Sequence, residues 1–145
     1  MANYTSTIIA AARSKAVGAI LTDKVSVSAA PTTSDVIRFG PFPGGLVPTH
    51  VTFVHGELDT GTDALRAKVG YKPVDGTTGD DDLFGSALTT FNAASGAAGS
   101  SLVASDRVEI TKPFFIEIVP TTGSNAMAAA KTVICQLFGE LLGAK

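Results

Sequence analysis

The sequence predicts a mainly β protein: an antiparallel, jelly-roll-like β-sandwich with one short helix and an N-terminal arm. Apolar and β-branched residues alternate with polar ones in several short stretches, as half-buried strands require. Gly, Pro and Asp cluster between these stretches and mark turns. About eight such stretches occur, the number that a jelly roll needs. We expect an arm at residues 1–22 and one sandwich domain at residues 23–145.

The N-terminal arm allows two conformations. Its alanines favour a helix, but Gly18 and the shortness of the apolar blocks fit an extended segment equally well. We expect the arm either to close an edge of the sandwich or to reach onto a neighbouring subunit. A frayed terminus is the remaining alternative.

Two strands are expected before residue 49. Val25 and Val27 alternate with serines, and Pro31 ends that strand. The next strand lies around residues 36–39 and ends in a Pro- and Gly-rich connection at residues 40–48.

The strongest strand signal lies between residues 49 and 73. Alternation at residues 51–54 and again at 65–71 flanks a polar, Gly-containing segment at 57–62. We predict two antiparallel strands paired as a hairpin, whose apolar faces a second sheet must cover.

A short helix is expected at residues 81–92. The spacing of Leu83, Phe84 and the apolar residues up to Phe91 matches one helix face, and the run Asp80 to Asp82 suits the positive end of a helix dipole. The Gly, Ser and Ala tract that follows, up to residue 101, lacks an anchoring side chain and predicts a mobile loop.

Three regions supply the remaining strands. Residues 102–110 give one or two short pieces, and residues 114–119 give a clear strand. In the last region, residues 131–142, helical and strand periods compete. We predict a strand there because a sandwich has to close.

The composition bounds the class of partner. The formal charge is -2 and the basic residues are scattered, which argues against general affinity for nucleic acid or an anionic membrane. The start of the chain lacks a basic segment before its short apolar stretch, so we expect an unsecreted, soluble protein. Charged residues are only 17% of the chain, against roughly 25% in an average domain. Either other subunits or a partner cover part of the surface, or the surface is small and neutral.

Few residues offer chemistry. His50 and His55 lie five apart on a strand, which points them to opposite faces, so we expect surface or interface histidines. Cys135 is the only cysteine, and its apolar neighbours predict a buried, unreactive thiol with a raised pKa. Neither a phosphate-binding loop nor a nucleophile elbow occurs, so nothing supports an enzyme.

Two acidic segments are weak calcium candidates. Residues 59–63 have the oxygen spacing of part of a calcium loop but lack the distal bidentate glutamate. The run Asp80 to Asp82 is explained by the expected helix start. We therefore predict no metal and no other cofactor, with calcium at either segment as the alternative.

Residues 35–92 resemble the small accessory proteins that tailed bacteriophages encode beside their major capsid protein. The resemblance rests on GPFPGGLVP, THVTFV, ALRAKVGYKPVDG and DDDLFGSAL. The family phrase is matched here by Val69, Gly70, Tyr71, Pro73, Asp75, Gly76, Asp82 and Phe84.

This resemblance implies a capsid cement or decoration protein. Such a protein binds the outside of the capsid, bridges major capsid protein subunits and commonly assembles as a trimer. It would be made in the host cytoplasm and located on the virion surface. We expect the contacts to come from the arm and from rims at residues 41–48 and 72–82. The expected interface residues are Tyr4, Ile8, Ile9, Arg13, Val17, Ile20, Leu21, Phe42 and Pro43.

Two other classes remain open. A carbohydrate- or receptor-binding sandwich would need exposed aromatic side chains, and the chain has no Trp and only Tyr4 and Tyr71 as tyrosines. A small jelly-roll hydrolase would need a histidine and carboxylates that converge in space.

Overall fold

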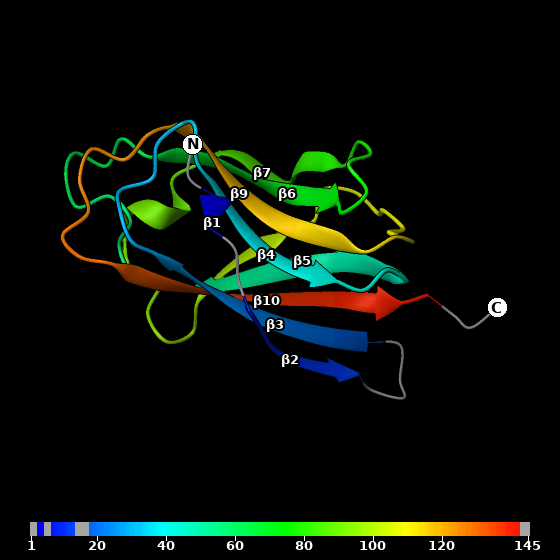
Figure 1. Ribbon diagram of the computed structural model, residues 1–145. Coiled ribbons are helices and arrows are strands. Elements are labelled where there is room, and N and C mark those ends of the chain that lie inside the picture. Colours follow the sequence, from blue (N-terminus) through cyan, green and yellow to red (C-terminus); the bar gives the residue numbers. More distant parts are fainter. Residues whose placement is uncertain (1–2, 5–6, 14–17, 143–145) are drawn as a thin grey trace.

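Two five-stranded sheets lie face to face (Figure 1). The computed structural model describes residues 3–4, 7–13 and 18–142. Sheet A contains, in spatial order, β1 (Asn3–Tyr4), β4 (Val36–Phe42), β9 (Phe114–Thr122), β6 (Arg66–Pro73) and β7 (Asp80–Leu88). Sheet B contains β2 (Thr7–Arg13), β3 (Gly18–Val27), β10 (Lys131–Leu141), β5 (Leu46–Val54) and β8 (Ser100–Val103).

The eight strands from β3 to β10 form a jelly roll. The order β3-β10-β5-β8 in one sheet faces β4-β9-β6-β7 in the other, and the neighbours within these two sets are antiparallel. Among these eight strands, only β6 and β7 are neighbours both in sequence and in space. The other connections between successive strands from β3 to β10 cross from one sheet to the other, as in a double Greek key. The predicted sandwich class is confirmed.

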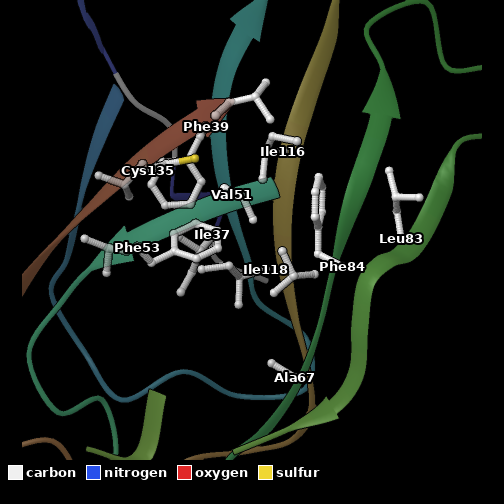
Figure 2. Close-up of a cluster of buried hydrophobic side chains, with 14 of the residues drawn as sticks. Ile37, Phe39, Val51, Phe53, Ala67, Leu83, Phe84, Ile116, Ile118 and Cys135 are labelled. Carbon is white, nitrogen blue, oxygen red and sulfur yellow. The ribbon is translucent and has the colours of Figure 1, made fainter. Parts of the chain in front are cut away.

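The core fills the space between the sheets because every second residue of each strand points inward. In β10, Val133, Cys135 and Leu137 are fully buried, while the residues between them reach the outer face. Phe39 of β4 and Phe53 of β5 come from opposite sheets, and their ring centroids lie 5.6 Å apart. Figure 2 shows this cluster, with side chains of both sheets directed into the same space. The strand predicted at residues 131–142 and the buried Cys135 are both confirmed.

The N-terminal residues add one strand to each sheet. β1 pairs in parallel with β4, and β2 pairs antiparallel with β3. These segments are extended rather than helical and lie at outer edges of the sandwich (Figure 1). The expected boundary between residues 22 and 23 falls inside β3, which begins at Gly18.

The predicted hairpin at residues 49–73 is wrong. β5 and β6 exist close to the predicted positions but belong to different sheets, where β5 pairs with β10 and β8. A period of two reports which face is buried and carries no information about the pairing partner. The segment between them, residues 55–65, crosses the end of the sandwich.

The helix predicted at residues 81–92 is also wrong. Residues 80–88 form β7, and only a 3₁₀ turn, η1 (Thr90–Asn92), follows. The register between β6 and β7 shifts twice, and Gly85 and Ala87 have φ values of +144° and +51°. This irregular strand buries the adjacent Leu83 and Phe84, which imitates the spacing of a helix face. The acidic run therefore opens a strand.

The Gly, Ser and Ala tract at residues 92–101 does contain an anchor. Ser95 donates its backbone N–H to the His55 carbonyl at 3.0 Å, and its Oγ accepts the His55 N–H at 2.9 Å. The tract then enters β8 at Ser100. Within the described residues, no helix is both long and apolar enough to cross a membrane.

Candidate interaction surface

The two histidines occupy different environments. His50 lies on the outer side of sheet B, where its ring stacks on Phe138 with centroids 4.2 Å apart. His55 is buried within this chain, which corrects the expectation that both are surface or interface residues. Its Nδ1 lies 2.8 Å from the Gly56 carbonyl and its Nε2 lies 3.3 Å from Ser100 Oγ. Burial lowers the pKa of His55, and the Gly56 hydrogen bond partly opposes this. In the part of the chain that the structure describes, neither histidine hydrogen-bonds to a carboxylate.

Asp59 organises the crossing at residues 55–65. Its fully buried carboxylate accepts the N–H of Gly61 at 3.0 Å on Oδ1, and those of Ala64 and Leu65 at 2.8 and 3.0 Å on Oδ2. Burial acts to raise the pKa of Asp59, but these backbone hydrogen bonds and one from the backbone of Asn125 outweigh it, and the pKa is lowered. Both oxygens are engaged by the backbone, so the segment is a capped loop rather than an open calcium site.

The second acidic candidate is a surface cluster. The carboxylates of Asp80, Asp81 and Asp82 lie within 4.8 Å of one another. Lys68 Nζ lies 3.1 Å from Asp81, and Asp80 accepts the Asp82 N–H at 3.2 Å. Burial, a side-chain hydrogen bond with Asp82 and the charges of Asp82 and Asp81 raise the pKa of Asp80, and the Asp82 N–H partly opposes this. These contacts account for the arrangement of the three carboxylates within the chain itself.

The residues expected at an interface do not share one surface. Leu21 and Phe42 are 2% and 1% exposed, so their side chains belong to the core of this chain. Ile20 is 45% exposed, Pro43 is exposed, and Tyr4 packs against the core while half-buried. Ile8, Ile9 and Arg13 lie in β2, and their side chains are outside the described part, as is Val17 entirely.

The outer face of sheet A carries charges, several of which are paired within the chain. Arg38 of β4 meets Glu117 of β9 with 2.6 Å between its guanidinium nitrogen and the carboxylate. The same guanidinium lies 4.7 Å from the Phe115 ring centroid. One strand further, Lys68 pairs with Asp81. This face therefore holds two ion pairs between neighbouring strands.

The outer face of sheet B is different, because an apolar row crosses four of its strands. The strand register places Ile20 beside Phe138, Phe138 beside His50, and His50 beside Val103. We call these four residues the cross-strand row. Val103 is 74% exposed, and Ile20 and Val103 are two of the three most exposed large apolar side chains in the described residues.

Two further rows of the sheet B outer face carry almost no charge. Beside the cross-strand row the register aligns Thr22, Gln136, Thr52 and Ser101, and then Lys24, Ile134 and Val54. The hydroxyls of Thr52 and Ser101 lie 2.8 Å apart. Lys24 is the only Lys, Arg, Asp or Glu in the three rows.

Sequence reasoning missed most of this surface. Alternation in TVICQLF does place Ile134 and Phe138 opposite the buried Cys135. The row itself depends on the strand order β3-β10-β5-β8, which a period of two does not reveal.

Comparison with known proteins gives similarity in fold. No family model matches the sequence, and no curated protein matches it. A chain in the capsid of Ralstonia phage GP4 has a TM-score of 0.68 and 22% identity, over 99% of this chain and 100% of that chain. A chain in the capsid asymmetric unit of cyanophage Pam1 has a TM-score of 0.63 and 18% identity, over 93% and 94% of the two chains. The jelly roll is therefore shared over nearly the whole length of all three chains.

Proposed function

We propose that this chain is a non-enzymatic structural protein of a bacteriophage virion, located on the capsid surface. The observation that carries the proposal is the fold, which matches a chain of a phage capsid from end to end. A jelly roll offers a rigid block with two broad outer faces and needs no reactive group to work as a structural unit. In the described residues, the histidines and acidic side chains are engaged in contacts that organise loops and strands.

We infer further that the chain acts as a cement or decoration protein, which binds the major capsid protein and bridges its subunits. The resemblance at residues 35–92 supports this role. A repeating lattice multiplies weak contacts through avidity, so a broad neutral surface suffices for stable attachment. The low proportion of charged residues suits a protein that buries surface against neighbours.

The direct test is binding to capsids that lack this chain. The purified protein should co-sediment with such capsids in a saturable way and raise the temperature at which they disassemble. Sedimentation at the level of an unrelated control protein would remove the capsid role. Binding without a change in disassembly temperature would retain the location and remove the bridging role.

The N-terminal arm is proposed as part of the attachment. A truncation must stop before β3, because Leu21 is a buried core residue. Removing residues 1–13 deletes β1 and β2 and leaves the eight jelly-roll strands in place. We expect a folded protein with weakened capsid binding. Unchanged binding by this variant would exclude the arm from the contact.

A further inference from the structure

His55 is a buried histidine at which three segments of the chain meet. It follows the end of β5, its ring centroid lies 4.9 Å from that of Phe91 in η1, and its Nε2 faces Ser100 at the start of β8. Nδ1 lies 2.8 Å from the Gly56 carbonyl, which can only accept, so Nδ1 carries the ring proton. Nε2 is then the acceptor, and the Ser100 hydroxyl donates to it. The neutral form of the ring therefore matches both partners.

The segment at residues 93–103, which we call the flap, lies over His55 and is held by few contacts. Ser95 donates its N–H to the His55 carbonyl at 3.0 Å, and Ser95 Oγ accepts the His55 N–H at 2.9 Å. Further along, the flap pairs with β5 from Ser100 to Val103, and Val103 is 74% exposed. None of the flap residues is fully buried, so little apolar area fixes this segment to the sandwich.

The other surroundings of His55 are held more firmly. Phe91 is a core residue, and its carbonyl accepts the Leu58 N–H at 2.9 Å. On the side opposite the flap, β5 pairs with β10 from Leu46 to Val54. A change that requires water at the His55 ring therefore displaces the flap before it displaces η1 or β5.

Charged side chains offer a proton on His55 no counter-ion. The flap, η1 and β5 contain no Lys, Arg, Asp or Glu. In the crossing at residues 55–65, Glu57 is the nearest acidic residue in sequence, and the Asp59 carboxylate is bonded to backbone N–H groups further along. From β10, the side chain of Lys131 lies against Gly56. Burial lowers the pKa of His55 and the Gly56 hydrogen bond partly opposes this, with no contribution from a charged side chain.

We propose that the flap is an acid-sensitive element, which protonation of His55 releases so that β5 becomes the edge strand of sheet B. The proton from solvent binds Nε2, which turns from an acceptor into a donor, so the Ser100 hydroxyl can no longer donate to it. The imidazolium is then a buried, unpaired charge, and opening the flap gives it water. The inference goes beyond the proposed function and stands without it, because it concerns a single isolated chain.

Hydrogen exchange of backbone amides, resolved by segment with mass spectrometry, tests the proposal at pH 7.5 and 5.5. Dividing the intrinsic exchange rate at each pH by the observed rate gives a protection factor that reports opening alone. The protection factor of the wild-type flap should fall severalfold between the two pH values. The limit for one proton is about tenfold, because His55 in the open flap titrates near 6.5.

β9 serves as the reference for global unfolding. A flap that opens within the folded protein should be less protected than β9 at both pH values. In about 1 M urea the protection of β9 should fall, whereas that of the flap should stay nearly constant, because local opening exposes little surface. Flap protection that equals that of β9 and shares its urea dependence would overturn the inference.

Three single variants of the full chain assign the effect to His55. His55→Gln has no group that titrates in this range, so its flap protection should be equal at the two pH values. His50→Gln is the matched control, because it removes the other histidine, five positions earlier, and should keep the wild-type pH ratio. Ser95→Ala removes the acceptor of the His55 N–H, so it should lower flap protection at both pH values and keep the ratio. Far-ultraviolet circular dichroism verifies that each variant is folded.

The release of the flap by His55 is refuted if wild-type flap protection is the same at pH 7.5 and 5.5. It is refuted equally by a pH effect that persists in His55→Gln or disappears in His50→Gln, and by Ser95→Ala with unchanged flap protection. The wild-type comparison of the flap with β9 decides the question even where His55→Gln does not fold.

Discussion

Replacing Asp59 by Asn should destabilise the protein far more than the same change elsewhere in its loop. The buried carboxylate accepts three backbone N–H groups, and hydrogen bonds to a charged acceptor contribute roughly 1.5–3 kcal/mol each. An amide oxygen turned toward Ala64 and Leu65 keeps two acceptor contacts. Its NH₂ then faces the Gly61 N–H, donor against donor. A neutral amide costs less to bury than a charge, which offsets part of the loss.

The expected decrease in the free energy of unfolding is about 2–3 kcal/mol. Urea denaturation measures it as a midpoint lower by about 1 M, for a slope near 2 kcal/mol/M. Asp63→Asn is the matched control, because Asp63 is exposed in the same loop and its φ of +56° suits Asn. We expect the control to change stability by less than about 0.5 kcal/mol. Equal effects of the two variants would refute the assignment of the loop to Asp59.

Acid provides a second measurement of the same contact. The pKa of Asp59 is lower in the folded protein than its ordinary 3.8, so the carboxylate contributes stability above that value and loses it as pH falls below. The free energy of unfolding of the Asp59→Asn variant should decline less steeply than that of the wild type as the pH falls below 3.8. Calcium at about 1 mM should leave the wild-type midpoint unchanged, because both oxygens already accept backbone donors. A calcium-dependent rise would contradict the capped-loop interpretation.

Three further predictions concern single buried positions. Burial lowers the pKa of His55 below 6.5, so the unfolded chain binds the proton more readily than the folded one. The free energy of unfolding should therefore fall as the pH drops below about 6.5, by at most ~1.4 kcal/mol per pH unit. Urea midpoints of the wild type and of His55→Gln between pH 7.5 and 5 test this, and parallel pH curves for the two proteins would contradict it. Cys135 is fully buried and burial raises its pKa, so a thiol reagent should modify it only after denaturation; fast labelling of the native protein would count against this core. Gly70→Ala should lower the free energy of unfolding, measured by urea denaturation, by about 2–4 kcal/mol, because a Cβ there overlaps the backbone of Asp80 and Asp81. Gly123→Ala is the control: its Cβ meets only ordinary contact distances, so its stability should be close to that of the wild type.

The sequence predicted the strands better than their partners. Alternation at residues 51–54 and 114–119 reports directly which side chains face the core, and β5 and β9 lie there. The pairing of β5 with β10 joins residues eighty or more positions apart, and no local pattern encodes it. The hairpin prediction failed for this reason, since adjacency in sequence was taken for adjacency in space.

The helix prediction failed for a different reason. Apolar residues at one- and three-residue steps occur in a helix, but also where a bulge turns two successive side chains to the same side. Leu83 and Phe84 are such a pair, and Gly85 and Ala87 supply the positive φ values that the irregular strand needs. Gly70 was a signal that residues 80–88 form a neighbouring strand, because a glycine inside a strand marks a close approach of another backbone, here that of Asp80 and Asp81.

Once the strand order is known, the part of the surface with few charged residues can be identified. The outer face of sheet A carries ion pairs such as Arg38 with Glu117, while the three rows of sheet B hold Lys24 as their one charged residue. Because charged residues are depleted at the core of an interface, this asymmetry favours sheet B as the face that meets a neighbour under the proposed function. The same composition spread evenly over both sheets would not have favoured one face for the interface.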